Sequence, residues 1–419
     1  MRRVLLVVLV MLAVLPGAAS AQVAGASVVQ EGDALLVAMP SAVEGRFLRV
    51  SDPRIHIARD REDDHLVRLT PAPARPVEVR ALSRDGHATV VTVDASGILS
   101  STGRDPGTVI AGRGLLIAAL CLLLGVVVVR RVVVERGLSD PIRPPGTRRS
   151  EPDPRRIRGI DLPTELWTVV GALGVLGGVA VMASTLRRLE TGGPSAAVSF
   201  LLRTRPGLAL LVQMVAVVVS CAVMRRGWAG SAPVTRLVTG VTAVALLASS
   251  LAGHATAGSD AVLGFAFDGV HTLASAVWLG GLVALAAAVG GGTSHEGPDL
   301  AGLASVVVRF SALALVCVAA IVVTGVYRAL AEIPSVSSLT DTDYGVALLM
   351  KIGVFGLMLI VAAYNRFVIH PRLERAALGL ADDDRGATAL LRRSVRVEIA
   401  LAIVVLAVVA VLVATTPPV

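Results

Sequence analysis

The sequence has little charge and few aromatic residues for its length. Of its 419 residues, 17% are charged and 3% are aromatic, whereas 54% are hydrophobic. A soluble globular chain of this length carries more charge, so the composition predicts a polytopic membrane protein. The net charge of +8 comes from arginines that lie between apolar segments. This distribution favours membrane topology over nucleic-acid binding.

Cysteine and lysine are also scarce. The three cysteines, Cys121, Cys221 and Cys317, all fall inside apolar segments, and Lys351 is the only lysine. This pattern excludes a disulfide framework and a paired-cysteine metal motif. The sequence also lacks a Walker loop and a Cys-Pro-Cys triplet. It therefore gives no support for a nucleotide cofactor or a nucleotide-driven pump, and we expect no enzymatic activity.

The first 21 residues have the pattern of a secretory signal peptide. Arg2 and Arg3 precede an apolar run over residues 4–15, and Ala19-Ser20-Ala21 forms an A-x-A cleavage site. Cleavage at this site would leave a mature chain that begins at Gln22. The alternative is an uncleaved anchor helix, and in both cases the next segment is exported.

Residues 22–106 are polar and free of cysteine, with short alternating runs that predict a small β domain outside the membrane. Asp85 and His87 flank Gly86 between two of these runs. An aspartate and a histidine on either side of a glycine turn can converge on one metal ion. The simpler interpretation is a solvated turn.

Eight apolar segments predict an all-α membrane bundle behind the β domain. Residues 107–252 would hold four helices and a basic cytoplasmic loop at 135–163, and residues 253–419 would hold four more. The expected helices cover 108–134, 165–186, 208–224, 236–251, 260–290, 303–327, 344–364 and 397–415.

Arginine bias sets the expected orientation in the cytoplasmic membrane. The loops at 135–163 and 366–396 are basic and are predicted to lie inside, which places both mature termini outside. One segment departs from the rule, because it would place four arginines outside: Arg187, Arg188, Arg203 and Arg205.

The fifth segment carries polar residues at helical spacing. The stripe on one helix face is Gly264, Asp268, His271, Ser275 and Trp278. A carboxylate and an imidazole are costly in hydrocarbon, so this face is predicted to look into the bundle. Lys351 lies at a similar depth in the seventh segment, and we expect an Asp268–Lys351 ion pair. Near the cytoplasmic ends of their helices, Arg309 and Glu398 are expected to form a structural ion pair or to reach the interface.

Two sets of side chains are candidate metal ligands. The first set, His254, Asp268 and His271, suits divalent copper or zinc. The second set is Met214 and Cys221, which lie on one helix face and offer a thioether and a thiol, ligands that favour Cu(I). The alternatives are a hydrogen-bonded interior histidine for the first set and core packing for the second.

The segment Asp268 to Leu282, DGVHTLASAVWLGGL, resembles the Asp/His–Trp-Leu-Gly-Gly pattern of the copper-resistance D (CopD) membrane family. Further motifs follow in the family's order: Arg309-Phe310-Ser311, Thr324-Gly325, Tyr344-Gly345 with Leu348, Leu349 and Lys351, Asn365 with Pro371, Glu398, and Thr416-Pro417. The resemblance covers about residues 253–418. The remainder resembles proteins in which an exported CopC-like domain precedes an eight-helix CopD region.

The resemblance implies what the β domain and the bundle do. In CopC the turn that is similar to residues 83–87 supplies Asp and His to Cu(II), which carries over to Asp85 and His87. The CopC ligand at the mature N-terminus is a histidine, and Gln22 stands there in this chain. For the bundle, the resemblance implies copper movement across the membrane, with uptake as the expected direction.

The resulting hypothesis is a copper transporter. Copper would enter at His254, be held near Asp268 and His271, and leave past Met214 and Cys221. The expected partners are copper ions, the lipid bilayer and an exported copper chaperone, without nucleic acid or haem. The alternatives are a haem-binding membrane redox protein and a copper sensor or accessory subunit that does not transport.

Overall fold

The computed structural model describes thirteen segments of the chain. They are residues 28–39, 43–60, 63–84, 88–94, 97–102, 107–139, 162–190, 193–226, 231–252, 261–290, 300–333, 335–380 and 384–413. The predicted signal peptide, Asp85, His87 and His254 lie outside these residues.

The first five segments form a β sandwich of two antiparallel four-stranded sheets. One sheet has the order β1-β2-β5-β4 and the other β3-β6-β7-β8. The strands are β1 (Val28–Glu31), β2 (Ala34–Ala38), β3 (Val43–Val50), β4 (His56–Arg59), β5 (Leu66–Thr70), β6 (Val77–Ser83), β7 (Ala88–Asp94) and β8 (Gly97–Thr102). The predicted β domain is therefore present.

Alternation of side chains explains the sandwich. In β6, Val79 and Ala81 are fully buried, and Val93 in β7 and Leu69 in β5 join the same core. Residues that alternate with them face away from the sandwich core, and one of these, Leu82 in β6, is buried in the cluster of the membrane helices.

The rest of the described chain contains eight helices that are long and apolar enough to span a membrane, which confirms the predicted membrane bundle. They are α2 (Gly107–Val129, continued by a π-helical turn and α3, Glu135–Ser139), α5 (Thr164–Arg188), α7 (Arg205–Arg225), α8 (Ala232–Ala252), α9 (Ala261–Gly290), α10 (Leu300–Glu332), α12 (Asp343–Tyr364, continued by a π-helical turn and α13, His370–Ala377) and α14 (Asp384–Val413). Two short helices, α6 (Pro194–Arg203) and α11 (Ser338–Asp341), lie between them.

Four of these helices extend by five residues or more beyond the predicted bounds. α2 continues through its π-helical turn into α3, α10 continues to Glu332, α12 continues through its π-helical turn into α13, and α14 begins at Asp384 rather than at 397. Each added segment carries charged residues, so hydropathy alone did not extend the helices that far. One consequence is that Glu398 lies near the middle of the 30-residue α14, about 21 Å from its start, and not near its end as predicted.

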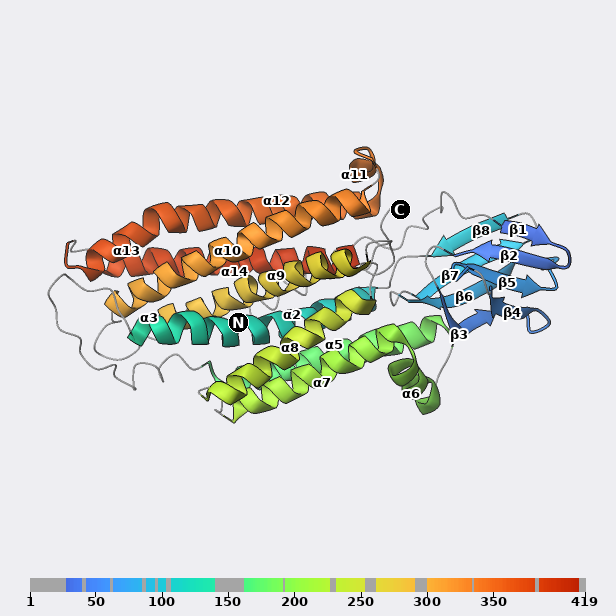
Figure 1. Ribbon diagram of the computed structural model, residues 1–419, viewed down its shortest axis with the longest axis horizontal. Coiled ribbons are helices and arrows are strands. Elements are labelled where there is room, and N and C mark those ends of the chain that lie inside the picture. Colours follow the sequence, from blue (N-terminus) through green and yellow to red (C-terminus); the bar gives the residue numbers. More distant parts are fainter. Residues whose placement is uncertain are drawn as a thin grey trace.

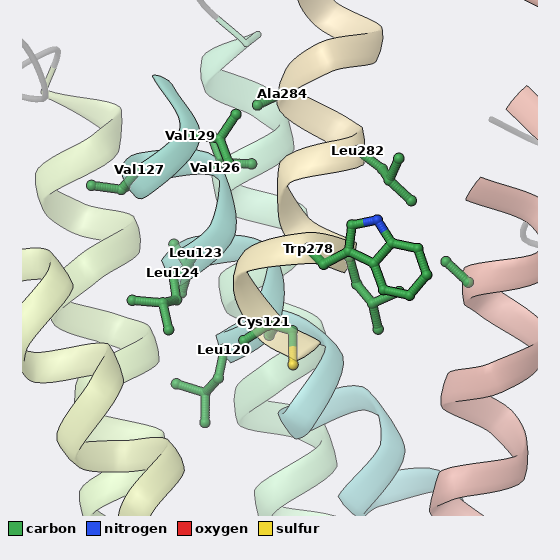
Figure 2. Close-up of a cluster of buried hydrophobic side chains, with 14 of the residues drawn as sticks. Leu120, Cys121, Leu123, Leu124, Val126, Val127, Val129, Trp278, Leu282 and Ala284 are labelled. Atoms are coloured by element: carbon green, nitrogen blue, oxygen red, sulfur yellow. The ribbon is translucent and has the colours of Figure 1, made fainter. Parts of the chain in front are cut away.

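Helix α2 occupies the centre of the bundle. It packs against α5, α7, α8, α9 and α14 and is the most buried of the eight spans. Its closest approach is to α9, where a Cβ added to Gly125 would lie 2.5 Å from the Gly280 Cα and would overlap the Ala276 carbonyl oxygen. Small residues at such crossings let membrane helices pack closely. Figure 2 shows the Leu, Val and Cys side chains of α2 beside α9 in this core.

The β sandwich sits at one end of the bundle, called here the β-domain end (Figure 1). Arg80 in β6 forms an ion pair with Glu190 at 2.8 Å and donates to the Arg188 carbonyl oxygen at 3.1 Å, just past the end of α5. Phe47 in β3 packs edge-to-face against Phe200 in α6, with 6.2 Å between ring centroids. Leu82 belongs to the same buried cluster as the membrane helices. These contacts dock the β domain on α5 and α6.

The α2–α9 crossing gives a stability prediction. Replacing Gly125 by alanine places a methyl group against backbone atoms that cannot rotate away, so we expect a loss of about 1–3 kcal/mol of stability. The matched control is Gly240→Ala on α8, where an added Cβ meets nothing within 4 Å and helix propensity gains up to about 1 kcal/mol. Thermal unfolding of the detergent-solubilised protein measures both. Equal shifts in the two variants would contradict the predicted crossing.

Candidate polar site between α9, α10 and α12

Polar side chains from three helices meet in the half of the bundle next to the β domain. Along the helix axes, Asp268 lies about 10 Å and His271 about 15 Å from the start of α9, and Lys351 lies about 12 Å from the start of α12. His271 is 8% exposed, whereas Val262 and Val270 on other faces of α9 are 84% and 48% exposed. The prediction that the Asp268–His271 face looks into the bundle is confirmed.

Asp268 is held by an arginine of α10. The Arg328 guanidinium forms an ion pair with Asp268 and a second one with Glu332, at 3.0 Å. The Tyr344 hydroxyl, at the start of α12, donates to the other oxygen of Glu332. The partner of Asp268 is therefore Arg328 and not the predicted Lys351. Arg328 lies beside Asp268 on the adjacent helix, whereas the Lys351 ammonium reaches His271.

His271 bridges α10 and α12 through its two ring nitrogens. Nδ1 lies 3.0 Å from the Thr324 hydroxyl oxygen, and Nε2 lies 3.5 Å from Lys351 Nζ. The Thr324 hydroxyl donates its own hydrogen to the Ala320 carbonyl oxygen at 2.6 Å. Thr324 can therefore only accept from His271, which assigns the imidazole proton to Nδ1. The lone pair is then on Nε2, and Lys351 donates to it.

The charges of this network balance. Asp268 and Glu332 supply two carboxylates, and Arg328 and Lys351 supply two cations. Unpaired charges at this depth are costly, so a balanced set is what a membrane interior requires. The Arg328 side chain is 34% exposed, whereas that of Asp268 is 13% exposed. The network is thus more open at the guanidinium than at the carboxylate.

The start of α12 is positioned by its sequence. Thr342 caps the helix by accepting from the Gly345 backbone N–H at 3.0 Å, and its hydroxyl donates to the Ser338 carbonyl oxygen of α11 at 2.6 Å. A Cβ at Gly345 would overlap that same carbonyl oxygen. The Tyr344-Gly345 pair therefore has two roles: the tyrosine binds Glu332, and the glycine allows α11 to lie against α12.

Aromatic contacts lie on both sides of the network. Phe267 and Tyr327 stack at 4.1 Å between α9 and α10, and Trp278 packs edge-to-face on Phe355 at 5.9 Å between α9 and α12. Trp278 lies two turns beyond His271 on the same face of α9. The backbone of α12 packs chiefly against α14. Long side chains thus make its described contacts with α9.

A second polar contact lies in the opposite half of the bundle. Asn365, in the π-helical turn after α12, donates from Nδ2 to Glu398 Oε1 at 2.6 Å, and Glu398 is 4% exposed. The prediction paired Glu398 with Arg309 or sent it to the interface. Its described hydrogen-bond partner is Asn365, because the longer α14 places the carboxylate beside the π-helical turn.

The sulfur side chains of α7 face a different helix. Met214 packs on Gly178 and Cys221 packs on Gly171, both in α5, where an added Cβ would lie 2.6 Å and 3.4 Å from the two sulfur atoms. Cys221 is buried. α7 packs against α5, α8 and α2, away from the His271 network. This placement favours the packing interpretation of Met214 and Cys221.

Metal binding by the predicted ligands stays a prediction. Among the described residues, no group of three or more His, Cys, Asp and Glu side chains is arranged to hold a metal ion. His254, Asp85 and His87 lie outside the described segments. What the site offers is a single imidazole nitrogen, His271 Nε2, whose lone pair faces the Lys351 ammonium group.

Sequence reasoning missed Arg328 and Glu332, and it named Thr324 only as part of a family motif. A signal was present, because spacing by four residues places all three on one face of a helix. It was overlooked because the helix was expected to end at 327, which left Arg328 and Glu332 in a loop.

Two comparisons with known families match the membrane region. Residues 104–265 match the model described as "Copper resistance protein D-like, N-terminal domain", and residues 304–412 match "Copper resistance protein D". The second segment includes Thr324, Arg328, Lys351 and Glu398. Asp268 and His271 lie between the two matched segments.

Two known proteins are similar to this chain. One is Copper resistance protein D of Pseudomonas syringae pv. tomato, 35% identical over 203 residues, which are 48% of this chain and 63% of the relative. The other is Copper transport protein CutJ of Bacillus subtilis (strain 168), 34% identical over 120 residues, 29% of this chain and 22% of the relative. Each match spans less than two thirds of the relative. No solved structure matches the chain.

A double-mutant cycle tests the pairing in this site. We expect Asp268→Asn and Arg328→Gln to be coupled by about 1–3 kcal/mol, because each variant leaves the other charge without its partner. Asp268→Asn and Lys351→Met should be coupled more weakly than the first pair, because these two side chains make no direct ion pair. Denaturation of the purified protein in mixed micelles provides the stabilities. Stronger coupling of Asp268 to Lys351 than to Arg328 would reverse the assignment.

Proposed function

We propose that the protein moves copper ions across the cytoplasmic membrane in the direction of uptake, because its membrane-spanning region matches two copper resistance protein D family models. Copper is the cargo in this proposal. The orientation rests on the predicted signal peptide, which would export the β domain. The β-domain end of the bundle is then the outer end, where the ion enters.

The observation that carries the proposal is the state of His271. Neutral imidazole nitrogen is a ligand for copper in both common oxidation states. His271 Nδ1 donates to the Thr324 hydroxyl, which itself donates to the Ala320 carbonyl oxygen, so the lone pair is on Nε2, as a metal ligand requires. This nitrogen lies about 15 Å into the membrane helix, where a polar group without a role is costly.

In this proposal the Lys351 side chain must move when copper binds to His271. Its ammonium lies 3.5 Å from Nε2, on the side of the ring from which a ligated cation would bind. Two unit charges about 5 Å apart repel by roughly 3 kcal/mol at an effective dielectric constant of about 20. Copper and the ammonium group therefore compete for one place. In the proposed mechanism Lys351 holds the place of the cation while the site is empty and swings away when the ion binds.

Charge balance supports this exchange. With Lys351 on His271, the two carboxylates and two cations of the network cancel. Asp268 and Glu332 are held by Arg328 and keep that guanidinium away from Nε2. In this view Asp268 serves as a positioning residue for Arg328, and His271 is the ligand.

The proposed path continues along the same three helices. Cys317 lies two turns beyond Thr324 on α10, and Met358 lies two turns beyond Lys351 on α12, both toward the opposite end. Both are buried, at 6% and 0% exposure. Their soft sulfur atoms suit Cu(I). The path leaves out Met214 and Cys221, which pack on α5, and His254 remains the expected entry residue.

Measurements of copper affinity and copper flux in Lys351 variants test the proposal. Lys351→Leu removes the competing charge without adding a ligand, so we expect copper to bind at least about tenfold more tightly and to leave more slowly, which lowers flux into proteoliposomes. Lys351→Arg retains the charge and should not bind copper more tightly. The Lys351→Leu gain should vanish in the double variant with His271→Ala.

The control is His56→Ala, which alters an exposed histidine on the edge strand β4. We expect flux to be unchanged in this variant and strongly reduced in His271→Ala. Copper flux that survives in His271→Ala would contradict the mechanism. A Soret band in the purified protein would instead favour the haem alternative.

A further inference from the structure

Helix α6 accounts for the arginines that break the charge rule. Arg187 and Arg188 end α5, Arg203 ends α6, and Arg205 begins α7. Three of the four, Arg187, Arg203 and Arg205, are exposed. All four lie at the β-domain end, where the α5 and α7 spans end. A basic cluster at this membrane face needs a physical reason, because loops on the outer side normally carry few arginines.

The two faces of α6 differ in what they contact. Phe200 is 2% exposed and packs on Phe47 of the β domain. Val198 and Leu202 lie on the opposite face, one turn apart, and are 54% and 59% exposed. With only 10 residues, α6 is too short to span a bilayer. Figure 1 shows it beside the β-domain end, out of line with the long helices.

The junction with α7 fixes the orientation of α6. The Thr204 hydroxyl donates to the Phe200 carbonyl oxygen at 2.8 Å and accepts from the Gly207 backbone N–H at 3.0 Å. A Cβ at Gly207 would overlap the same carbonyl oxygen. Since Phe200 is also clamped by Phe47, the helix cannot rotate to bury Val198 and Leu202. The exposed apolar face is a fixed feature of the fold.

We propose that α6 is an interfacial helix that binds anionic phospholipid in the leaflet next to the β domain. Val198 and Leu202 contact the acyl chains, and Arg203 and Arg205 bind the phosphate groups. An apolar face with adjacent cations at the level of the membrane surface is complementary to such lipids. The inference depends on the membrane span alone and not on copper transport.

Anchoring of α6 in the lipid also positions the β domain. Phe200 carries the contact to Phe47 on the buried face, so the same helix contacts lipid, bundle and β domain. The Arg80–Glu190 ion pair adds a second attachment, next to α6 in the sequence. The β domain is thereby held at the membrane surface over the end of α5.

Fluorescence quenching in nanodiscs tests the proposal on the full chain. The three native cysteines are buried, so a fluorophore can be attached selectively to Leu202→Cys. The quenchers are spin labels at headgroup depth, carried by phosphatidylglycerol or by phosphatidylcholine at equal mole fraction. Val29→Cys, 55% exposed in strand β1, is the control expected to stay unquenched.

We expect strong quenching at residue 202 and a preference for the phosphatidylglycerol quencher. The double variant Arg203→Gln/Arg205→Gln should reduce this preference by about fivefold for each arginine. Arg54→Gln/Arg75→Gln removes the same charge from exposed positions of the β domain and should leave the preference intact.

Three outcomes would overturn the proposal. If the fluorophore at residue 202 is quenched as little as the one at residue 29, α6 does not enter the lipid. Quenching that rises on dilution of protein in lipid would show that a second copy of the chain covers α6. Equal quenching by both lipids would remove the phosphate contacts of Arg203 and Arg205.

Discussion

The arrangement of α9, α10 and α12 depends on one constraint: charges placed at membrane depth must be neutralised inside the bundle. Asp268, Arg328, Glu332 and Lys351 satisfy it jointly, and they come from three different helices. Arg328 cannot leave Asp268 without exposing a carboxylate to hydrocarbon, and Lys351 needs the lone pair of His271. These contacts set how the three helices are rotated about their axes. Apolar packing alone is a weak guide in lipid, where no hydrophobic force drives helices together.

Periodicity in the sequence was sufficient to predict which residues of α9 face inward, because a helix with 3.6 residues per turn fixes its own faces. It could not predict which cation reaches Asp268. Arg328 and Lys351 both lie in the half of the bundle next to the β domain, and the choice between them is made by lateral packing of helices far apart in the sequence. The start of α14 was missed for another reason: Arg392, Arg393 and Arg396 lower the hydropathy of a segment that is nevertheless helical.

The sulfur residues show the same limit. Spacing predicted that Met214 and Cys221 lie on one face of α7, and in the structure both side chains do face the same helix, α5. It could not reveal that the facing residues are Gly178 and Gly171, whose lack of a side chain makes room for bulky sulfur groups. Residue type indicates what a side chain can bind, but its neighbour decides what it does. By this criterion Cys317 and Met358, on the two helices that contact His271, are better placed than Met214 and Cys221 for the proposed copper path.

The attachments of the β domain bear on how such a path can open. Its described ion pairs and ring contacts run to α6 and to the end of α5, and α6 is locked to α7. The helices that carry the charged network lie on the other side of α2. Within this group of helices, α12 contacts α9 through the side chains of Lys351 and Phe355. These side chains can change rotamer without breaking backbone packing. Movement of the Lys351 side chain away from His271 would leave the backbone packing of α12, the β domain, α5 and α7 in place. It would free Nε2 for a cation, and the Arg328 ion pairs with Asp268 and Glu332 would stay intact, the condition that any ion path through hydrocarbon must meet.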